Sequence, residues 1–368
     1  MPSGIRREPG EAPRVKTYRI AAIGGDGIGP EVVEAGLEVL DALAARDGSF
    51  TLEVERLPWG SGFYRATGRM MPEDGLERLR TFDAISFGAV GDPLIPDHVS
   101  LWGLRLRICQ GLDQYANVRP ARLLPGIASP VRTGALDCVI VRENSEGEYA
   151  GQGGRSHRGL PAEVGTEVAV FTRHGVERIM RFAFDLARGR PRRHLHVVTK
   201  SNAQRHGMVL WDEVAREVAA GFPEVAWRFE LVDAMSTRFV LNPASIDVVV
   251  ATNLHADILS DLAAAVAGSL GIAPTANLDP ERRGPSMFEP IHGSAFDLVG
   301  RGIANPIATF WSGALMLQHL GEAGAAAALV AAIERVTAAG VVTPDLGGRA
   351  TTAEVTRAVI DAVRGANR

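Results

Sequence analysis

Cysteine is scarce in this sequence: the chain has 2 cysteines in 368 residues, and their spacing matches no zinc-binding pattern. One pair would be a thin disulfide framework for a chain of this length, so we expect a reducing compartment. Long apolar runs are also missing, since none reaches the roughly 20 residues that span a bilayer. Residues 1–17 lack the apolar core of a signal peptide, and we interpret them as a disordered leader. These absences predict a cytoplasmic protein without a membrane-spanning segment.

A strong charge of either sign is missing as well. The formal net charge is -4, whereas a domain that binds a nucleic-acid backbone or an anionic membrane carries an excess of Lys and Arg. We therefore expect neither nucleic acid nor membrane as a partner, and small-molecule chemistry is the better expectation. Hydrophobic residues make up 46% of the chain, enough for a large core, and the length suits two lobes.

What the chain does have is an alternation of short β-rich runs with longer helical periods. The β-rich runs predict strands at 18–23, 83–87, 138–141, 196–199 and 246–251. Apolar residues at helical spacing predict helices at 31–45, 176–187, 208–220 and 258–267. This alternation predicts an α/β fold with a largely parallel sheet. No Pro- or Ser-rich linker divides the chain, so we expect the sheet to join the two lobes.

Polar residues follow three of the predicted strands. They form the motifs REN (142–144), KSN (200–202) and TN (252–253). In open α/β sheets the ligand lies beyond the carboxyl ends of the strands. The three motifs together therefore indicate a charged ligand.

Asp257 and Asp261 stand four residues apart at the start of a predicted helix, so their carboxylates project from one face. This geometry suits Mg²⁺ or Mn²⁺, which take a few carboxylates and complete their shell with substrate and water. Compensation of the helix dipole by acidic residues in the first turn explains the pair equally well. Asp233, which ends another apolar run, is a candidate third carboxylate.

A glycine-rich run, GGDGIG (24–29), follows the first predicted strand. Its spacing does not match the G-x-G-x-x-G fingerprint of dinucleotide-binding loops. A tight turn between the first strand and the first helix accounts for the glycines equally well.

Eight motifs occur in the order in which one enzyme family carries them, between about residues 18 and 363. They are IGGDGIGPE (23–31), NVRP (117–120), VRENSEGEY (141–149), TKSN (199–202), DILSD (257–261), FEPIHGSA (288–295), GIANP (302–306) and TPDLGG (343–348). By these motifs the chain resembles the β-decarboxylating dehydrogenases, the family of isopropylmalate, isocitrate, homoisocitrate and tartrate or D-malate dehydrogenases. The stretches PWGSGFY, GDPLIPDHVSLWG and DQYANVRP are most similar to the tartrate and D-malate branch.

The resemblance implies an isopropylmalate dehydrogenase-like, two-lobed α/β fold rather than a true Rossmann domain. The large cofactor-binding lobe would comprise residues 18–114 and 271–368, and the small lobe with the dimer contact would comprise residues 115–270. The protein would be a homodimer with shared active sites, because Lys200 and Asp233 would enter the site of the partner subunit.

The implied activity is the oxidation of a small 2-hydroxy diacid of the tartrate or D-malate type by NAD, with decarboxylation for some substrates. Arg119 and Arg142 would grip the substrate carboxylates, a task suited to the planar guanidinium fork. Lys200 would help to remove the hydroxyl proton, and Tyr149 would protonate the enol that decarboxylation leaves. The residues implied to hold Mn²⁺ or Mg²⁺ as a Lewis acid are Asp233, Asp257 and Asp261.

The resemblance also assigns residues to the cofactor. Asp297 would accept hydrogen bonds from the ribose hydroxyls and repel a 2′-phosphate, which favours NAD over NADP. Asn202 and Asn305 would complete the nicotinamide and adenine contacts. The family further allows a monovalent cation such as K⁺, for which no residue is assigned. The residues implied to line the adenosine pocket are His292, Gly293, Ser294 and Ala295.

The sequence departs from the family pattern at the first substrate-binding arginine, where it has Cys109. A thiol cannot replace a bidentate guanidinium, and the lost charge-assisted contact is commonly worth about 1.5 to 3 kcal/mol. We assign Arg107, two positions earlier, to substrate binding in its place. Arg105, from the same segment, is the alternative.

Three further departures lie near the metal and the cofactor. His255 and Ala256 replace an aromatic residue and a glycine, and Phe296 replaces a proline. His255 would be either an added ligand or a loop substitution, and Ala256 would be strained if that position requires a positive φ. These changes leave two alternative functions open: a non-catalytic or regulatory homologue that binds a ligand or a partner chain, and an isopropylmalate- or isocitrate-type dehydrogenase.

Overall fold

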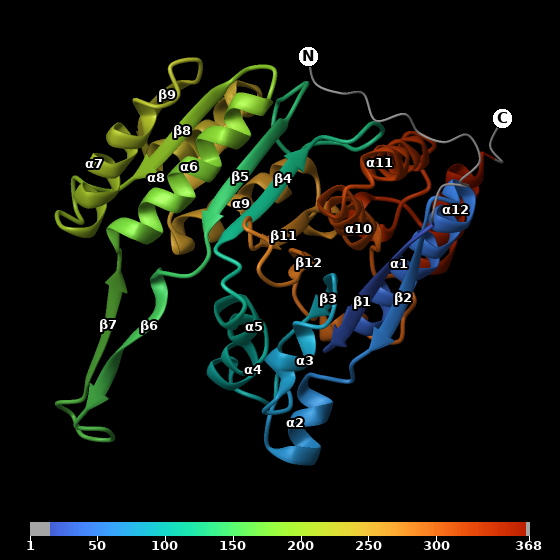
Figure 1. Cartoon of the computed structure of the whole chain (residues 1–368), viewed down its shortest axis with the longest axis horizontal. Helices are drawn as coiled ribbons and strands as arrows, with labels where there is room; N and C mark the ends of the chain where they lie inside the picture. Colours follow the sequence, from blue (N-terminus) through green and yellow to red (C-terminus); the bar gives the residue numbers. More distant parts are fainter. Residues whose placement is uncertain (1–14, 366–368) are drawn as a thin grey trace, which may run out of the picture.

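One ten-stranded mixed sheet organises residues 15–365, the part of the chain that the computed structural model describes (Figure 1). In spatial order its strands are β2 (Phe50–Arg56), β1 (Lys16–Gly25), β3 (Ala84–Ala89), β12 (Ser286–Pro290), β11 (Pro274–Leu278), β4 (Ala116–Arg122), β5 (Asp137–Glu143), β10 (Val248–Ala251), β8 (His194–Thr199) and β9 (Ala226–Leu231). Neighbours are parallel towards both ends of the sheet. The three pairings in the middle, from β12 to β5, are antiparallel. The predicted α/β fold with a mostly parallel sheet is confirmed, and its two parallel ends run in opposite directions.

All five predicted strands are present, as β1, β3, β5, β8 and β10, and each end lies within two residues of its predicted position. The predicted leader lies outside the described residues as far as position 14. Its last two residues, Lys16 and Thr17, belong instead to β1, where they pair with Phe50 and Thr51 of β2.

The twelve α-helices of the described chain include the four that periodicity predicts, which are α1, α6, α7 and α9. The full set is α1 (Gly29–Asp47), α2 (Ser61–Thr67), α3 (Gly75–Leu79), α4 (Asp97–Gly103), α5 (Arg105–Gly111), α6 (Arg173–Gly189), α7 (Gly207–Ala219), α8 (Val232–Leu241), α9 (Asn253–Ala267), α10 (Ile307–Leu320), α11 (Ala323–Ala338) and α12 (Thr352–Arg364). Four 3₁₀ turns complete the described elements: η1 (Pro243–Ser245), η2 (Leu270–Ile272), η3 (Phe296–Leu298) and η4 (Pro344–Leu346).

Helix α9 begins earlier than its apolar periodicity predicts, at Asn253 rather than at residue 258. The Thr252 side chain caps it by accepting a hydrogen bond from the backbone N–H of His255. As a result Asp257 lies in the second turn, and the first turn holds no acidic residue. The helix dipole acts mainly on the first turn, so it no longer explains the aspartate pair well.

Helices cover the sheet along its length. In the half that contains β5, β8 and β10, α6 lies in front of the sheet and α9 behind it in the view of Figure 1, with α7 against α6 and α8 against α9. In the other half, α1 and α10 contact the strands, and α11 and α12 pack on them. No helix of the described chain is both long and apolar enough to cross a bilayer. The sheet runs through both predicted lobes, and the division at residues 115 and 270 stays a prediction.

Strands β6 (Gly147–Ser156) and β7 (Val164–Val170) form a separate antiparallel ribbon that projects from the body of the protein (Figure 1). Most of the ribbon is exposed, including the apolar side chains of Val164 and Val168. Tyr149 lies near its base, where β6 leaves the main sheet. The ribbon therefore joins an exposed apolar arm to a predicted site residue.

The glycine-rich run after β1 is a tight turn against two neighbouring loops. A Cβ at Gly25 (φ 71°) would lie 1.9 Å from the Ala89 carbonyl oxygen, and one at Gly27 (φ 59°) would lie 1.9 Å from that of Ser294. The Ile28 N–H donates to the same Ser294 oxygen at 2.8 Å. These contacts give a physical reason for the glycines: they let the turn approach the HGSA loop.

Candidate active site

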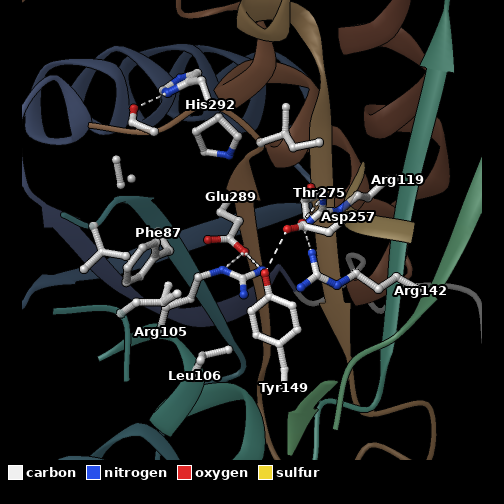
Figure 2. Close-up of a pocket in the computed structure, with 17 residues that line it drawn as sticks. Phe87, Arg105, Leu106, Arg119, Arg142, Tyr149, Asp257, Thr275, Glu289 and His292 are labelled. Carbon is white, nitrogen blue, oxygen red and sulfur yellow. Dashed lines mark hydrogen bonds and ion pairs between the residues drawn. The ribbon is translucent and has the colours of Figure 1, made fainter. Parts of the chain in front are cut away.

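A cavity of about 170 Å³ opens where the ends of β3 and β12 meet α5 and the base of β6 (Figure 2). Its charged lining consists of three guanidinium groups and two carboxylates. Pockets for drug-sized ligands usually measure about 300 to 1,000 Å³, so this cavity fits a molecule of few atoms. The excess of guanidinium groups favours an anion. The lining residues are Phe87, Gly88, Ala89, Val90, Leu101, Arg105, Leu106, Arg119, Arg142, Tyr149, Asp257, Thr275, Glu289, Pro290, Ile291, His292 and Gly293.

Arg119 and Arg142 reach the cavity from the neighbouring strands β4 and β5, and both are buried. Arg119 Nη1 donates to Asp257 Oδ1 at 3.1 Å and to Ser260 Oγ at 2.6 Å. Arg142 Nη1 contacts the same Asp257 oxygen, and its Nε donates to Asn253 Oδ1 at 2.9 Å. The structure thus brings the two predicted carboxylate-binding arginines to one predicted metal ligand.

The two arginines control the charge of Asp257. Burial raises the pKa of this carboxyl, but the guanidinium groups of Arg142, Arg119 and Arg105 outweigh it, so the net pKa is lowered. Burial, followed by repulsion from Arg142, lowers the pKa of Arg119 to about 10. At neutral pH both Asp257 and Arg119 therefore keep their charged forms.

Tyr149 faces the same cluster from the ribbon (Figure 2). Its hydroxyl donates to Asp257 Oδ2 at 3.2 Å, and the Arg142 guanidinium lies 5.1 Å from the centre of its ring. Burial, followed by the negative charge of Asp257, raises the pKa of the Tyr149 phenol. The phenol is thus protonated at neutral pH and can act as an acid.

Arg105, rather than Arg107, reaches the cavity from α5. Arg105 Nε donates to Glu289 Oε1 at 2.8 Å, deep in the lining. Arg107 lies outside the lining, and its Nη2 donates to the Glu73 carbonyl oxygen at 3.4 Å. The geometry therefore gives Arg107 no part in the cavity, contrary to our assignment from the sequence. Position 107 is roughly 200° around the helix from position 105, so it faces another direction.

The three aspartates assigned to the metal do not meet within one chain. Asp257 lines the cavity, and Asp261 follows one turn later on α9. Asp233 is on α8, with 66% of its side chain exposed, and accepts a hydrogen bond from Lys200 Nζ at 2.9 Å. Among residues 15–365, no three His, Cys, Asp or Glu side chains of the single chain are grouped to hold a metal. Asp257 and Asp261 supply oxygen donors of the type that Mg²⁺ and Mn²⁺ prefer.

Lys200, the predicted base, is also absent from the cavity lining of its own chain. It follows β8 and stays beside Asp233. The structure therefore divides these predicted substrate-binding, metal-binding and catalytic residues into two groups. Arg119, Arg142, Tyr149 and Asp257 lie at the cavity, and Lys200 and Asp233 lie elsewhere on the surface.

Two buried polar atoms at the cavity lack a protein partner. His292 Nδ1 contacts the Gly293 carbonyl oxygen at 3.0 Å, whereas its Nε2 has no hydrogen-bond partner in the described chain. Thr275 Oγ1, on β11, is unpartnered in the same way. Buried polar atoms are rarely left without a hydrogen-bond partner, so these two atoms indicate a ligand that forms hydrogen bonds with them.

The other predicted cofactor residues lie at different places around the HGSA loop. Ser294 and Ala295 are half-buried, and Asp297 is exposed on η3. The Asn305 side chain is already engaged, donating to Asp345 at 2.9 Å. Asn202 is exposed in the turn after β8 and does not line the cavity.

The departures from the family pattern prove mild in the structure. Ala256 lies inside α9 and does not have a positive φ, so the strain that we considered there is absent. His255 is buried beside it, with no partner for Nδ1 in the described residues. Phe296 is 39% exposed and contributes nothing to the cavity lining. None of these three residues lines the cavity.

A small cavity with an excess of guanidinium groups is suited to a small anionic ligand. The chain belongs to the isocitrate/isopropylmalate dehydrogenase family, whose model matches residues 19–363. This match confirms the resemblance that the sequence motifs indicate.

Individual relatives cover nearly the whole chain. It is 67% identical over 356 residues to the "Probable tartrate dehydrogenase/decarboxylase" of Agrobacterium vitis, covering 96% of this chain and 99% of the relative. It is 51% identical over 355 residues to the D-malate dehydrogenase [decarboxylating] of Escherichia coli, covering 94% and 98%. Among solved structures, the isocitrate dehydrogenase of Methylococcus capsulatus superposes with a TM-score of 0.85 at 36% identity, covering 94% of this chain and 99% of that one. These relatives confirm the predicted branch and the predicted fold.

Proposed function

We propose that the protein oxidises a small 2-hydroxy diacid of the tartrate or D-malate type, using NAD and a divalent cation, with decarboxylation for some substrates. The observation that carries the proposal is the convergence of Arg119, Arg142, Tyr149 and Asp257 on one small cationic cavity. The names of the relatives support it, since they include tartrate dehydrogenases/decarboxylases and a decarboxylating D-malate dehydrogenase.

The chain's own residues bind and orient the substrate. Arg119 and Arg142 present guanidinium groups from two adjacent strands, which can hold one carboxylate of the diacid in a fixed direction. Tyr149 keeps its proton at neutral pH and would deliver it to the carbon that loses carbon dioxide. When bound by Asp257 and Asp261, Mn²⁺ or Mg²⁺ would act as a Lewis acid towards the oxygen atoms of the substrate.

The proposed reaction requires a second subunit. Lys200 and Asp233 lie outside the cavity of their own chain, and they would complete the cavity of the partner. Four large apolar side chains are exposed to solvent on the adjacent helices α8 and α9, close in sequence to Asp233 and Asp257. They are Val240, Leu241, Leu254 and Ile258. A homodimer would bury these side chains and bring the Lys200–Asp233 pair across the interface.

The family is generally dependent on a divalent metal and NAD(P). We propose NAD for this chain, because the exposed carboxylate of Asp297 would repel the 2′-phosphate of NADP. The unpartnered Nε2 of His292 and the close approach of the glycine turn to Ser294 support a dinucleotide site at the HGSA loop. Asn202 and Asn305 stay proposals at the edges of this region.

NADH formation tests the proposal directly. The purified protein is assayed with NAD and Mn²⁺ on D-malate, both tartrate enantiomers, isopropylmalate and isocitrate, with and without a metal chelator. We expect chelator-sensitive turnover of D-malate or tartrate. Turnover of isopropylmalate or isocitrate alone would move the chain to another branch of the family. No turnover by a folded dimer that binds NAD would favour a non-catalytic homologue.

A further inference from the structure

We propose that Arg105, held by Glu289, determines specificity at this site: it supplies the guanidinium that position 109 lacks and selects a short diacid with a polar far end. The inference rests on the proposed function, because it names which part of the substrate the cavity distinguishes. Glu289 takes part as the anchor of Arg105 and as a hydrogen-bond acceptor.

Arg105 and Cys109 belong to the same face of α5, one turn apart. Cys109 is 1% exposed and lies in an apolar cluster with Phe87 and Met287. Burial raises the pKa of its thiol to about 11, so it carries no charge at neutral pH. Position 109 therefore carries no charge and lies outside the cavity lining, whereas the charged residue at position 105 lines the cavity.

The Arg105 guanidinium is fixed in place. Its side chain is 11% exposed, that of Glu289 is 6% exposed, and two of its nitrogen atoms lie 2.7 and 2.8 Å from Glu289 Oε1. Asn277 Nδ2 donates to the same oxygen at 2.7 Å. All these contacts use Glu289 Oε1. They therefore leave the other carboxylate oxygen of Glu289 and one nitrogen atom of Arg105 free to form hydrogen bonds.

The unused groups consist of one donor and one acceptor. Within residues 15–365, neither Arg105 Nη1 nor Glu289 Oε2 forms a hydrogen bond, and both residues line the cavity. Figure 2 shows this pair across the cavity from Arg119 and Arg142. If one substrate carboxylate binds Arg119 and Arg142, the far end of the molecule meets Arg105 and Glu289.

A donor and an acceptor side by side suit a substrate end that carries both a carboxylate and a hydroxyl or other O–H group. The carboxylate would accept a hydrogen bond from Arg105, and the O–H group would donate one to Glu289. An apolar branch, as in isopropylmalate, would bury both groups without partners, which is strongly disfavoured. A third carboxylate would be repelled by the negative charge of Glu289. The cavity of about 170 Å³ would also be too small for the larger molecule. The pair therefore selects a small polar diacid over both larger classes.

Two variants separate this role from a purely structural one. Arg105→Lys keeps a positive charge beside Glu289 but loses the planar fork of donors. The double variant Arg105→Leu/Glu289→Leu removes both charges, which avoids leaving one buried charge unpaired and so guards against failure to fold. Arg107→Lys is the matched control, since Arg107 lies on the same helix but outside the cavity lining.

Isothermal titration calorimetry measures the affinity of each Mn²⁺-loaded protein for D-malate, isopropylmalate and NAD. Thermal unfolding confirms that each variant is folded. We expect Arg105→Lys to bind D-malate roughly ten- to a hundredfold more weakly, with the NAD affinity retained. The double variant should lose at least about tenfold of its preference for D-malate over isopropylmalate. The Arg107→Lys control should match the wild type.

Unchanged D-malate affinity in folded Arg105→Lys would overturn the inference, as would equal weakening of all three ligands. Wild-type protein that binds neither acid would overturn it too. Binding is measured without turnover, so the two proposals can fail separately. If wild-type protein binds D-malate through Arg105 but forms no NADH, the proposed function is wrong and the inference on Arg105 still holds.

Discussion

The Lys200 ammonium lies 2.9 Å from the Asp233 carboxylate, yet neither residue lines the cavity of its own chain. The two residues therefore form one unit, an ion pair within a single chain. If that unit completes the cavity of the partner, the defects of two different variants can be separated between subunits.

We predict complementation between Lys200→Met and Tyr149→Phe. Each homodimer should be nearly inactive in decarboxylating turnover, because both of its sites lack one group. In a mixed dimer, one site collects both defects and the other is intact, so activity should return when subunits exchange. NADH formation after the two proteins are mixed and re-equilibrated checks this. Persistent inactivity of a demonstrated mixed dimer would mean that each site is built within one chain.

Asp261→Asn should raise the Mn²⁺ concentration required for half-maximal activity by at least about tenfold, because it removes one negative oxygen ligand. Burial raises the pKa of Asp261, so the charged carboxylate is costly without a cation. The metal-free variant should accordingly unfold at a temperature no lower than that of the wild type. Metal titration and thermal unfolding measure the two effects, and an unchanged Mn²⁺ requirement would argue against this ligand.

Asp297→Asn should reduce the preference for NAD over NADP. Loss of the carboxylate removes the repulsion of the 2′-phosphate and weakens the bond to the ribose hydroxyls. We expect the ratio of kcat/KM for the two cofactors to fall by about tenfold or more, which is about 1.4 kcal/mol. Asp185→Asn, on the exposed surface of α6, is the control. A preference that survives in Asp297→Asn would place cofactor selection elsewhere.

His196 should make the fold sensitive to acid. Burial, followed by repulsion from His194, Arg228 and Arg238, lowers its pKa to about 3, whereas an unfolded histidine titrates near 6.5. Between these values the unfolded chain binds a proton that the folded chain does not, so the free energy of unfolding falls as the pH falls. Nearby Glu230, 3.4 Å from His196 Nε2, does not reverse this net direction.

Urea unfolding at pH 7 and pH 5 measures this dependence. His196→Gln should flatten it by up to about 1.4 kcal/mol per pH unit, the linkage value for one proton. His157→Gln, at an exposed position of the ribbon turn, should leave the slope as in the wild type. Equal slopes in all three proteins would show that His196 does not control acid stability.

The sequence predicts the strands and helices whose apolar pattern is strong, and it misses those whose pattern is weak. β4 contains Pro120, and proline normally argues against a strand inside a sheet. The ribbon strand β6 is rich in glycine and mostly exposed, so no hydrophobic alternation marks it. The start of α9 depends on the Thr252 cap, a local signal that lies six residues before its apolar periodicity begins.

The candidate site was predictable in its parts but not in its arrangement. Family motifs identified Arg119, Arg142 and Tyr149, and the structure brings all three to one cavity. Helical spacing alone could have placed Arg105, rather than Arg107, on the face of Cys109. Glu289 gave no separate signal, because its role depends on Arg105 meeting it from an element far away in the sequence.

Two strands in the middle of the sheet, β4 and β11, connect its two parallel ends. The chain passes between the two parallel ends of the sheet only through β4 and β11, which lie side by side and are tied by a 2.6 Å hydrogen bond between Asn117 and Asn277. Arg105 and Glu289 lie on one side of these two strands and Tyr149 on the other, so each end of the sheet supplies one wall of the cavity and neither end forms it alone.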